Sequence, residues 1–167
     1  MFDKIGDMPL HPLAVHAPVI GIPLAFLLAV LFAFPRTRRW ARWPLAITVV
    51  GAAGATWVTR QSGLAFEKSQ HIKPDNRVGN LIALHAHYAN QLLVIMIAFA
   101  VVAVVNVFVV TRRVAGAAGG TTTRPGPLNL ILLVLLLVAA AAALFWVVRV
   151  GDIGARAVWN PTSTPLF

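Results

Sequence analysis

The sequence contains no cysteine, and this absence excludes several kinds of site at once. Disulfide bonds, thiolate metal sites, cysteine nucleophiles and covalently attached c-type haem all require the thiol group. Rieske-type iron–sulfur ligation is excluded for the same reason. Any metal or cofactor bound by this chain must therefore use histidine, methionine, carboxylate or backbone groups.

Charged residues are also scarce, at 11% of the 167 residues, against roughly 25% in soluble domains. Hydrophobic residues make up 59%, and the mean hydropathy is +0.80. Because these residues come in long blocks, the sequence predicts an integral membrane protein in contact with the lipid bilayer. The net charge of +9 reflects arginines that flank membrane-spanning segments, because the arginines cluster between apolar blocks. It does not indicate a nucleic-acid partner.

Four apolar blocks predict an all-α, integral membrane four-helix bundle that forms a single domain over residues 1–167. Hydrocarbon offers the backbone no hydrogen-bonding partner, so each block must be helical. The helices are expected at about 12–34, 44–60, 80–111 and 127–150. The stretch between the second and third helices is expected to be a polar loop, and the residues after 150 a tail. Short connections favour an up-down order.

Basic residues divide equally between the two predicted ends of the bundle, so their number alone does not give an orientation. One end carries Arg36, Arg38, Arg39, Arg42, Arg112, Arg113 and Arg124. The other end carries Lys4, Arg60, Lys68, Lys73, Arg77, Arg149 and Arg156. Four arginines in "RTRRWAR" lie directly against two helix ends, where positive charge weighs most. This favours both termini on the outer side of the membrane.

All five histidines fall at the outer end of the predicted bundle, two of them near the start of the first helix and two near the start of the third. His11 and His16 are separated by about 140° around an ideal helix, and His85 and His87 by about 200°. Neither helix can therefore turn both of its histidines toward one point. The expected pair takes one imidazole from each helix.

We expect this pair to be His16 and His87. His16 lies deeper in its helix than His11, and His87 shares a polar stripe with Asn90 and Gln91. A polar stripe in a membrane span should face the bundle interior. His11 and His85, which lies on a more apolar stripe, are expected as replacements or as supporting partners.

Two histidines on separate helices at matched depth are typical of a b-type haem site, because imidazole is a strong ligand of haem iron. Small residues in "GAAGAT" could let a flat ring approach the second helix. Arg149 and Arg60 are candidate ligands for haem propionates or a quinone headgroup, because arginine binds carboxylates well. The open alternative is copper or zinc held by several histidines. Structural hydrogen bonding is the simpler explanation for each histidine taken alone.

Three short segments resemble the DUF2231 family of predicted bacterial membrane proteins: "HPLAVHAPVI", "SGLAFE" and "GDIGARAV". That family looks similar to small four-helix cytochromes b, and some relatives appear joined to Rieske-type domains. The resemblance implies electron transfer with haem held by His11, His16 and one histidine of the third helix.

The leading hypothesis is a b-haem-binding membrane protein that works as an electron-transfer or quinone-linked cytochrome subunit. Its partners would be quinone or another redox protein, such as a Rieske-type or cytochrome complex, and a homo-oligomer is compatible with it. Two alternatives stay open: a cofactor-free accessory subunit of a larger membrane complex, and a copper-handling membrane protein. No motif assigns an enzymatic reaction.

Overall fold

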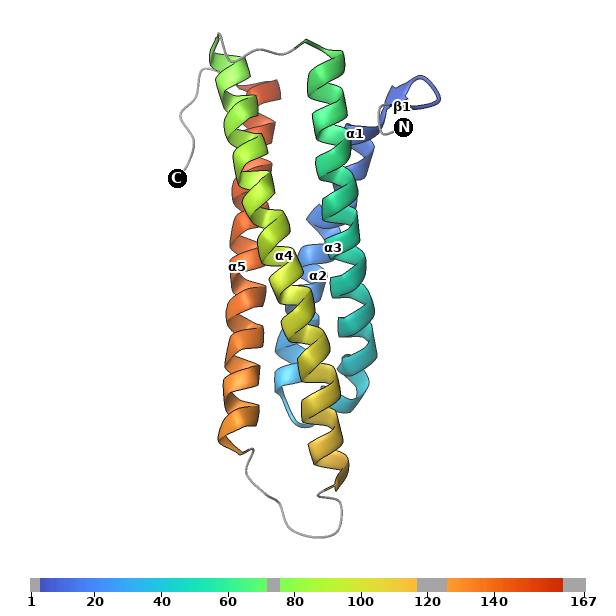
Figure 1. The fold of residues 1–167 in the computed structure, drawn as a ribbon, viewed down its shortest axis with the longest axis vertical. Helices are drawn as coiled ribbons and strands as arrows, with labels where there is room; N and C mark the ends of the chain where they lie inside the picture. The colour runs from blue at the N-terminus through green and yellow to red at the C-terminus, as the bar shows by residue number, and fades with distance from the viewer. Residues whose placement is uncertain (1–3, 72–75, 117–125, 161–167) are drawn as a thin grey trace.

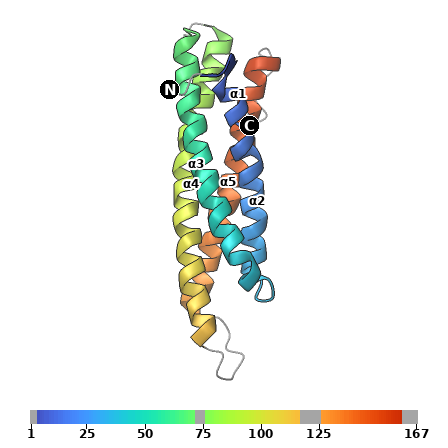
Figure 2. The ribbon, with the colours of Figure 1, turned by 90° about the vertical axis from the view of Figure 1, so that its right-hand side faces the viewer.

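A computed structural model describes residues 4–71, 76–116 and 126–160, and it forms a bundle of long helices in up-down order (Figures 1 and 2). The first long helix consists of α1 (Leu10–Ala14) and α2 (His16–Ala33). It is followed by α3 (Arg38–Ser69), α4 (Arg77–Gly116) and α5 (Pro127–Trp159). The predictions of an all-α fold and of four long helices are confirmed.

A short antiparallel hairpin precedes the bundle and was not expected from the sequence. Strand β1 (Lys4–Ile5) pairs with β2 (Met8–Pro9). Gly6 at its turn has a φ of +60°, a conformation that glycine adopts without steric cost. The hairpin lies beside α1, at the same end of the bundle as the end of α5 (Figure 1).

Three stretches are long and apolar enough to cross a membrane: Leu10–Ala33, Arg77–Val109 and Pro127–Trp159. Helix α3 is not among them, although it packs against both α2 and α4. Large apolar side chains point outward from all four long helices, as expected where lipid surrounds a bundle. Ile20, Ile47, Val94 and Val138 are each more than 60% exposed.

Small side chains line the contacts between the helices. Ala25, Ala29, Ala103, Ala140 and Ala143 are fully buried, which lets the helix backbones approach closely. The larger side chains of the core, among them Phe32, Met96 and Phe99, fill the space that remains.

Two helices extend well beyond the apolar blocks that revealed them. Helix α3 runs from residue 38 to residue 69, so "SGLAFE" is helical and not part of a loop. Helix α5 continues to residue 159, so "GDIGARAV" is its last part and not a tail. Hydropathy marks the length that crosses hydrocarbon, whereas packing against neighbouring helices continues past it. The segment "SGLAFE" therefore lies on α3, which faces α1, and "GDIGARAV" lies on α5, which faces α4.

A proline explains why the first long helix is interrupted at Val15. Pro18 has no N–H group to donate to the Ala14 carbonyl one turn earlier, and its ring crowds that carbonyl. The Thr59 hydroxyl of α3 donates to this free carbonyl across 3.0 Å. A side chain of the neighbouring helix therefore satisfies the backbone group that the proline leaves unpaired.

We predict that Thr59→Val destabilises the protein by about 1–3 kcal/mol, because it leaves the partly buried Ala14 carbonyl without a donor. In a Pro18→Ala background, a backbone N–H can return to this carbonyl, so the same substitution should cost less. Thermal unfolding of the four proteins of this cycle in detergent measures the coupling. Thr48→Val is the matched control, since Thr48 makes no hydrogen bond to the described residues. Equal costs in both backgrounds would contradict this account of the helix break.

Candidate functional site

His11 lies on α1, and the hydrogen-bonding partners of its side chain belong to α3. Its Nδ1 is 3.0 Å from the Thr59 carbonyl oxygen and 3.2 Å from the Ser62 hydroxyl. Its ring lies against Gly63, where an added Cβ would come within 3.0 Å of the imidazole. Phe66, one turn further, stacks on the ring at a centroid separation of 6.4 Å and an interplanar angle of 17°.

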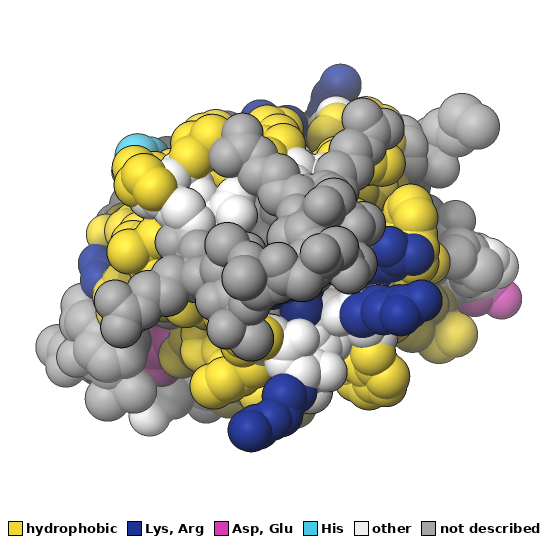
Figure 3. Space-filling view, turned by 90° about the horizontal axis from the view of Figure 1, so that it is seen from below, with side chains coloured by type: hydrophobic (Ala, Val, Ile, Leu, Met, Phe, Trp, Pro, Cys, Tyr) yellow, Lys and Arg dark blue, Asp and Glu magenta, His cyan; other side chains and the backbone are white. Residues whose placement is uncertain are grey.

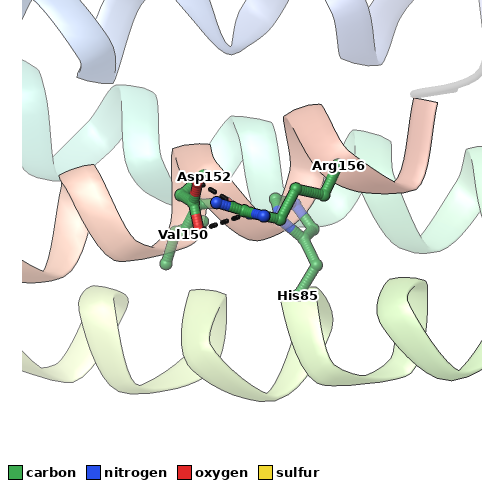
Figure 4. Close-up of polar contacts among 4 residues, drawn as sticks. All are labelled: His85, Val150, Asp152 and Arg156. Carbon is green, nitrogen blue, oxygen red and sulfur yellow. Dashed lines mark hydrogen bonds and ion pairs between the residues drawn. The ribbon is translucent and has the colours of Figure 1, made fainter. Parts of the chain in front are cut away.

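His85 lies on α4 and is held in the same manner by α5. Its Nδ1 is 2.9 Å from the Val150 carbonyl oxygen. Its ring lies against Gly154, where an added Cβ would come within 2.9 Å of the imidazole. Figure 4 shows His85 rising from α4 toward the turn of α5 that carries Val150, Asp152 and Arg156.

The two contacts follow one rule: each imidazole binds the carbonyl four residues before the glycine it packs against. In a helix the carbonyl of residue i already accepts from the N–H of residue i+4. A carbonyl oxygen can accept a second hydrogen bond, but a side chain on residue i+4 would obstruct the approach. Gly63 and Gly154 remove that obstruction. We call each arrangement an imidazole–glycine contact.

These contacts determine which nitrogen of each ring carries the proton. A carbonyl oxygen can only accept, so Nδ1 must donate in both His11 and His85. In a neutral imidazole the other nitrogen, Nε2, then keeps its lone pair. Hydrogen bonding of Nδ1 to a backbone carbonyl is also the usual way in which a protein orients a histidine that binds a metal through Nε2.

The two imidazoles meet between two pairs of helices, α1 with α3 and α4 with α5. Their ring centroids are 6.2 Å apart, and the ring planes are nearly perpendicular at 83°. Both side chains are partly buried, near the end of the bundle that carries the N-terminal hairpin. The structure therefore brings together one histidine from the first long helix and one from α4.

The pair differs from the one favoured by the sequence pattern. The His16 side chain is exposed, and its Nδ1 is 3.4 Å from the Leu13 carbonyl on its own helix. The His87 side chain is exposed too, and its Nε2 accepts from the Gln91 amide at 3.1 Å. Gly51 and Gly54 border open space, so the two glycines of "GAAGAT" do not contact the imidazole pair.

Polar side chains occupy the next turns of α4, deeper in the bundle. Tyr88 accepts a 2.6 Å hydrogen bond from Arg149, whose guanidinium also lies 4.3 Å from the centre of the phenol ring. The Arg149 Nε is buried without a hydrogen-bonding partner. Arg60 donates to the Asn90 side chain on the other side of α4.

Asp152 and Arg156 form a 2.9 Å ion pair on α5, one helical turn apart. Arg149, three residues before Asp152 on the same helix, binds Tyr88 and takes no part in this ion pair. Nearby, Trp146 donates to Gln91 at 3.0 Å, so these polar side chains join α4 to α5.

Within the described residues, no group of three or more His, Cys, Asp or Glu side chains is placed to hold a metal ion. A copper or zinc site of three protein ligands is thus not formed by this part of the chain. The only contact recorded there between two histidine rings is that of His11 with His85.

The residues that hold the two rings were not recognised as parts of a site from the sequence. Thr59 and Val150 act through their backbone carbonyls, which no side-chain pattern can reveal. Gly63 and Gly154 were present in the segments "SGLAFE" and "GDIGARAV", but these segments were placed in a loop and a tail. Their resemblance to family motifs was the one available signal.

Comparison with known proteins gives a family and no nearer relative. No curated protein and no solved structure matches the chain. The family described as "Predicted membrane protein (DUF2231)" matches residues 7–162, a range that includes both imidazole–glycine contacts. Its description agrees with the three helices that are long and apolar enough to cross a membrane. The chain belongs to the DUF2231 family of predicted membrane proteins.

Proposed function

We propose that this protein binds a b-type haem through His11 and His85 and transfers electrons within the membrane. The observation that carries the proposal is the meeting of two imidazoles, both donating through Nδ1 to a backbone carbonyl. Haem iron needs only two protein ligands, one on each face, so a site of two histidines is sufficient.

The spacing of the rings supports this proposal. A metal ion bound by both imidazoles through bonds of about 2 Å would hold the ring centres about 6 Å apart. The observed centroid separation is 6.2 Å. Both rings are already oriented by the imidazole–glycine contacts, so their Nε2 lone pairs are not used by these hydrogen bonds.

The surroundings of the pair suit an apolar macrocycle with carboxylate arms. Phe66 supplies an aromatic face beside His11. Arg149, with its unpartnered Nε, would hold a propionate, and Tyr88 would keep the guanidinium in position. Arg60 is the second candidate for this role, although Asn90 already accepts from its Nε.

Bound haem would supply reversible one-electron chemistry of its iron. The residues of the chain would hold the iron from both sides, keep their own protons on Nδ1 and exclude water with the packed helices. Electron exchange with quinone or with another redox protein of the same membrane is the role that we assign. Helix α3 would then act as the fourth spanning helix, with both termini on the outer side of a bacterial inner membrane.

Two alternatives make different predictions about the same pair. In a cofactor-free accessory subunit, the edge-to-face contact of His11 with His85 would be purely structural, and the purified protein would stay colourless. In a copper-handling protein, metal analysis would find copper in place of iron. Both are outcomes of the experiment that tests the proposal.

We predict a b-type reduced-minus-oxidised absorbance spectrum for the protein purified in mild detergent after expression with added haem precursor. His11→Ala and His85→Ala should each abolish this spectrum, because each removes one of the two imidazoles that would hold the haem iron. His16→Ala and His87→Ala are matched controls that should retain it, since both side chains are exposed. A protein that takes up no haem, or a loss of haem confined to the two control variants, would refute this assignment.

We also predict that Gly63→Ala and Gly154→Ala weaken haem binding by about 10–100-fold, the usual effect of removing support from a metal-binding histidine. The added methyl group would lie about 3 Å from the imidazole and displace it from its carbonyl. Haem titration of the apoprotein measures the affinity.

The control for this effect is the same substitution where nothing is crowded. Gly51→Ala and Gly54→Ala also change glycine to alanine within a helix, but an added Cβ there meets no atom within 4 Å. Both should leave the haem affinity unchanged. Similar losses from all four substitutions would show that the glycines act through the helix and not through the imidazoles.

A further inference from the structure

The two ends of the bundle differ completely in their acidic residues. All five acids of the chain belong to the N-terminal segment, the end of α3, the connection to α4 or the last part of α5: Asp3, Asp7, Glu67, Asp75 and Asp152. Residues 8–66 and 76–151 contain none. The end formed by the α2–α3 and α4–α5 connections therefore has no acidic residue with which to neutralise its basic side chains.

The basic residues at this end are all arginines. The seven are Arg36, Arg38, Arg39, Arg42, Arg112, Arg113 and Arg124, with no lysine among them. Arginine presents a planar fork of donors that matches the oxygens of a phosphate, whereas lysine acts as a point charge. Seen from this end, Lys and Arg side chains gather beside hydrophobic ones (Figure 3).

Of the four arginines at the α2–α3 turn, one donates side-chain hydrogen bonds to described residues and three do not. Arg38 donates to the carbonyls of Phe32 and Ala33 and so caps the end of α2. Arg36 and Arg39 are exposed and have no partner among the residues that the structure describes. The Nε of Arg42 is buried and without a hydrogen-bonding partner.

Aromatic side chains place these arginines at the depth of lipid headgroups. Trp40 is 62% exposed and Trp43 is 49% exposed, and the Arg42 guanidinium lies 5.4 Å from the centre of the Trp43 ring. Tryptophan favours the boundary between hydrocarbon and headgroups. We therefore expect the guanidinium groups next to it at the depth of phospholipid phosphates.

We propose that Arg36, Arg39 and Arg42 form a binding site for the phosphate of an anionic phospholipid. The negative headgroup would neutralise a basic end for which the chain supplies no acid, and the acyl chains would lie on the exposed apolar side chains of α2 and α3. Phe34, which is 58% exposed beside the turn, extends the apolar surface that the acyl chains would contact. This proposal is independent of haem binding at the opposite end.

Native mass spectrometry of the full-length protein, equilibrated with equal amounts of phosphatidylglycerol and phosphatidylcholine, tests the proposal. The wild type should retain phosphatidylglycerol preferentially, and the preference should fall as salt is added. The triple variant Arg36→Gln, Arg39→Gln and Arg42→Gln should lower this preference by about ten-fold or more, since each basic residue near an anionic surface contributes about five-fold.

A charge-matched triple variant at the other end, Lys4→Gln, Lys68→Gln and Arg77→Gln, should change the preference by less than about two-fold. Arg42→Lys, which keeps the charge but loses the planar fork, should reduce it by an intermediate amount. The thermal midpoint of each variant reports whether it is folded. A wild type without preference for phosphatidylglycerol, or equal losses from the two triple variants, would overturn the proposal, and the wild-type result needs no variant to fold.

Discussion

The structure near its histidine-rich end depends on one interaction, the hydrogen bond from an imidazole Nδ1 to the carbonyl oxygen of a helix residue. This oxygen can accept a second hydrogen bond because the residue four positions later is glycine, which has no side chain to obstruct the imidazole. It occurs once between α1 and α3, at Thr59, and once between α4 and α5, at Val150. Each bond joins two neighbouring helices and also fixes a tautomer. Because the two rings are in contact, with their planes nearly perpendicular, the bonds together set the relation of the two helix pairs. Packing and site chemistry therefore depend on the same four residues: two histidines and two glycines.

Much of the fold follows from the composition of the chain alone. Hydrocarbon allows only backbone that satisfies itself, so four apolar blocks without alternating patterning predict four helices. The helix ends could not be predicted in this way, because hydropathy falls where the chain leaves the hydrocarbon and not where the helix stops. The last part of α3 contains Arg60, Gln61 and Ser62, which resemble a loop in composition. Ser62 is nevertheless fully buried, and the helix continues because His11 packs against its Gly63 and Phe66.

The sequence pattern predicted a pair with one histidine ring from each of two helices, but it favoured His16 and His87 over His11 and His85. A polar stripe that includes His87, Asn90 and Gln91 was expected to face the interior. The hydrogen-bonding partner of His85 is instead a backbone carbonyl, which has no counterpart in a pattern of side chains. An apolar stripe is therefore compatible with a buried imidazole wherever the facing helix has a glycine at the required position. Gly154 is the glycine at this position here. It can be recognised only once Val150 and Gly154 are known to lie one turn apart on a helix.

Thr59 shows why the two imidazole–glycine contacts are not equivalent. Its carbonyl accepts from the His11 ring and from the Ser62 hydroxyl, and its own hydroxyl donates to Ala14, whose carbonyl Pro18 leaves free. The proline that breaks the first long helix thus creates an acceptor next to the residue that holds the imidazole. Helix α4 has no proline, and Val150 needs no such partner to hold His85. The α1–α3 contact therefore depends on a local break in the helix, whereas the α4–α5 contact depends on two continuous helices. A change in the first long helix would accordingly move His11 relative to His85, which stays fixed to the more extensive packing of α4 with α5.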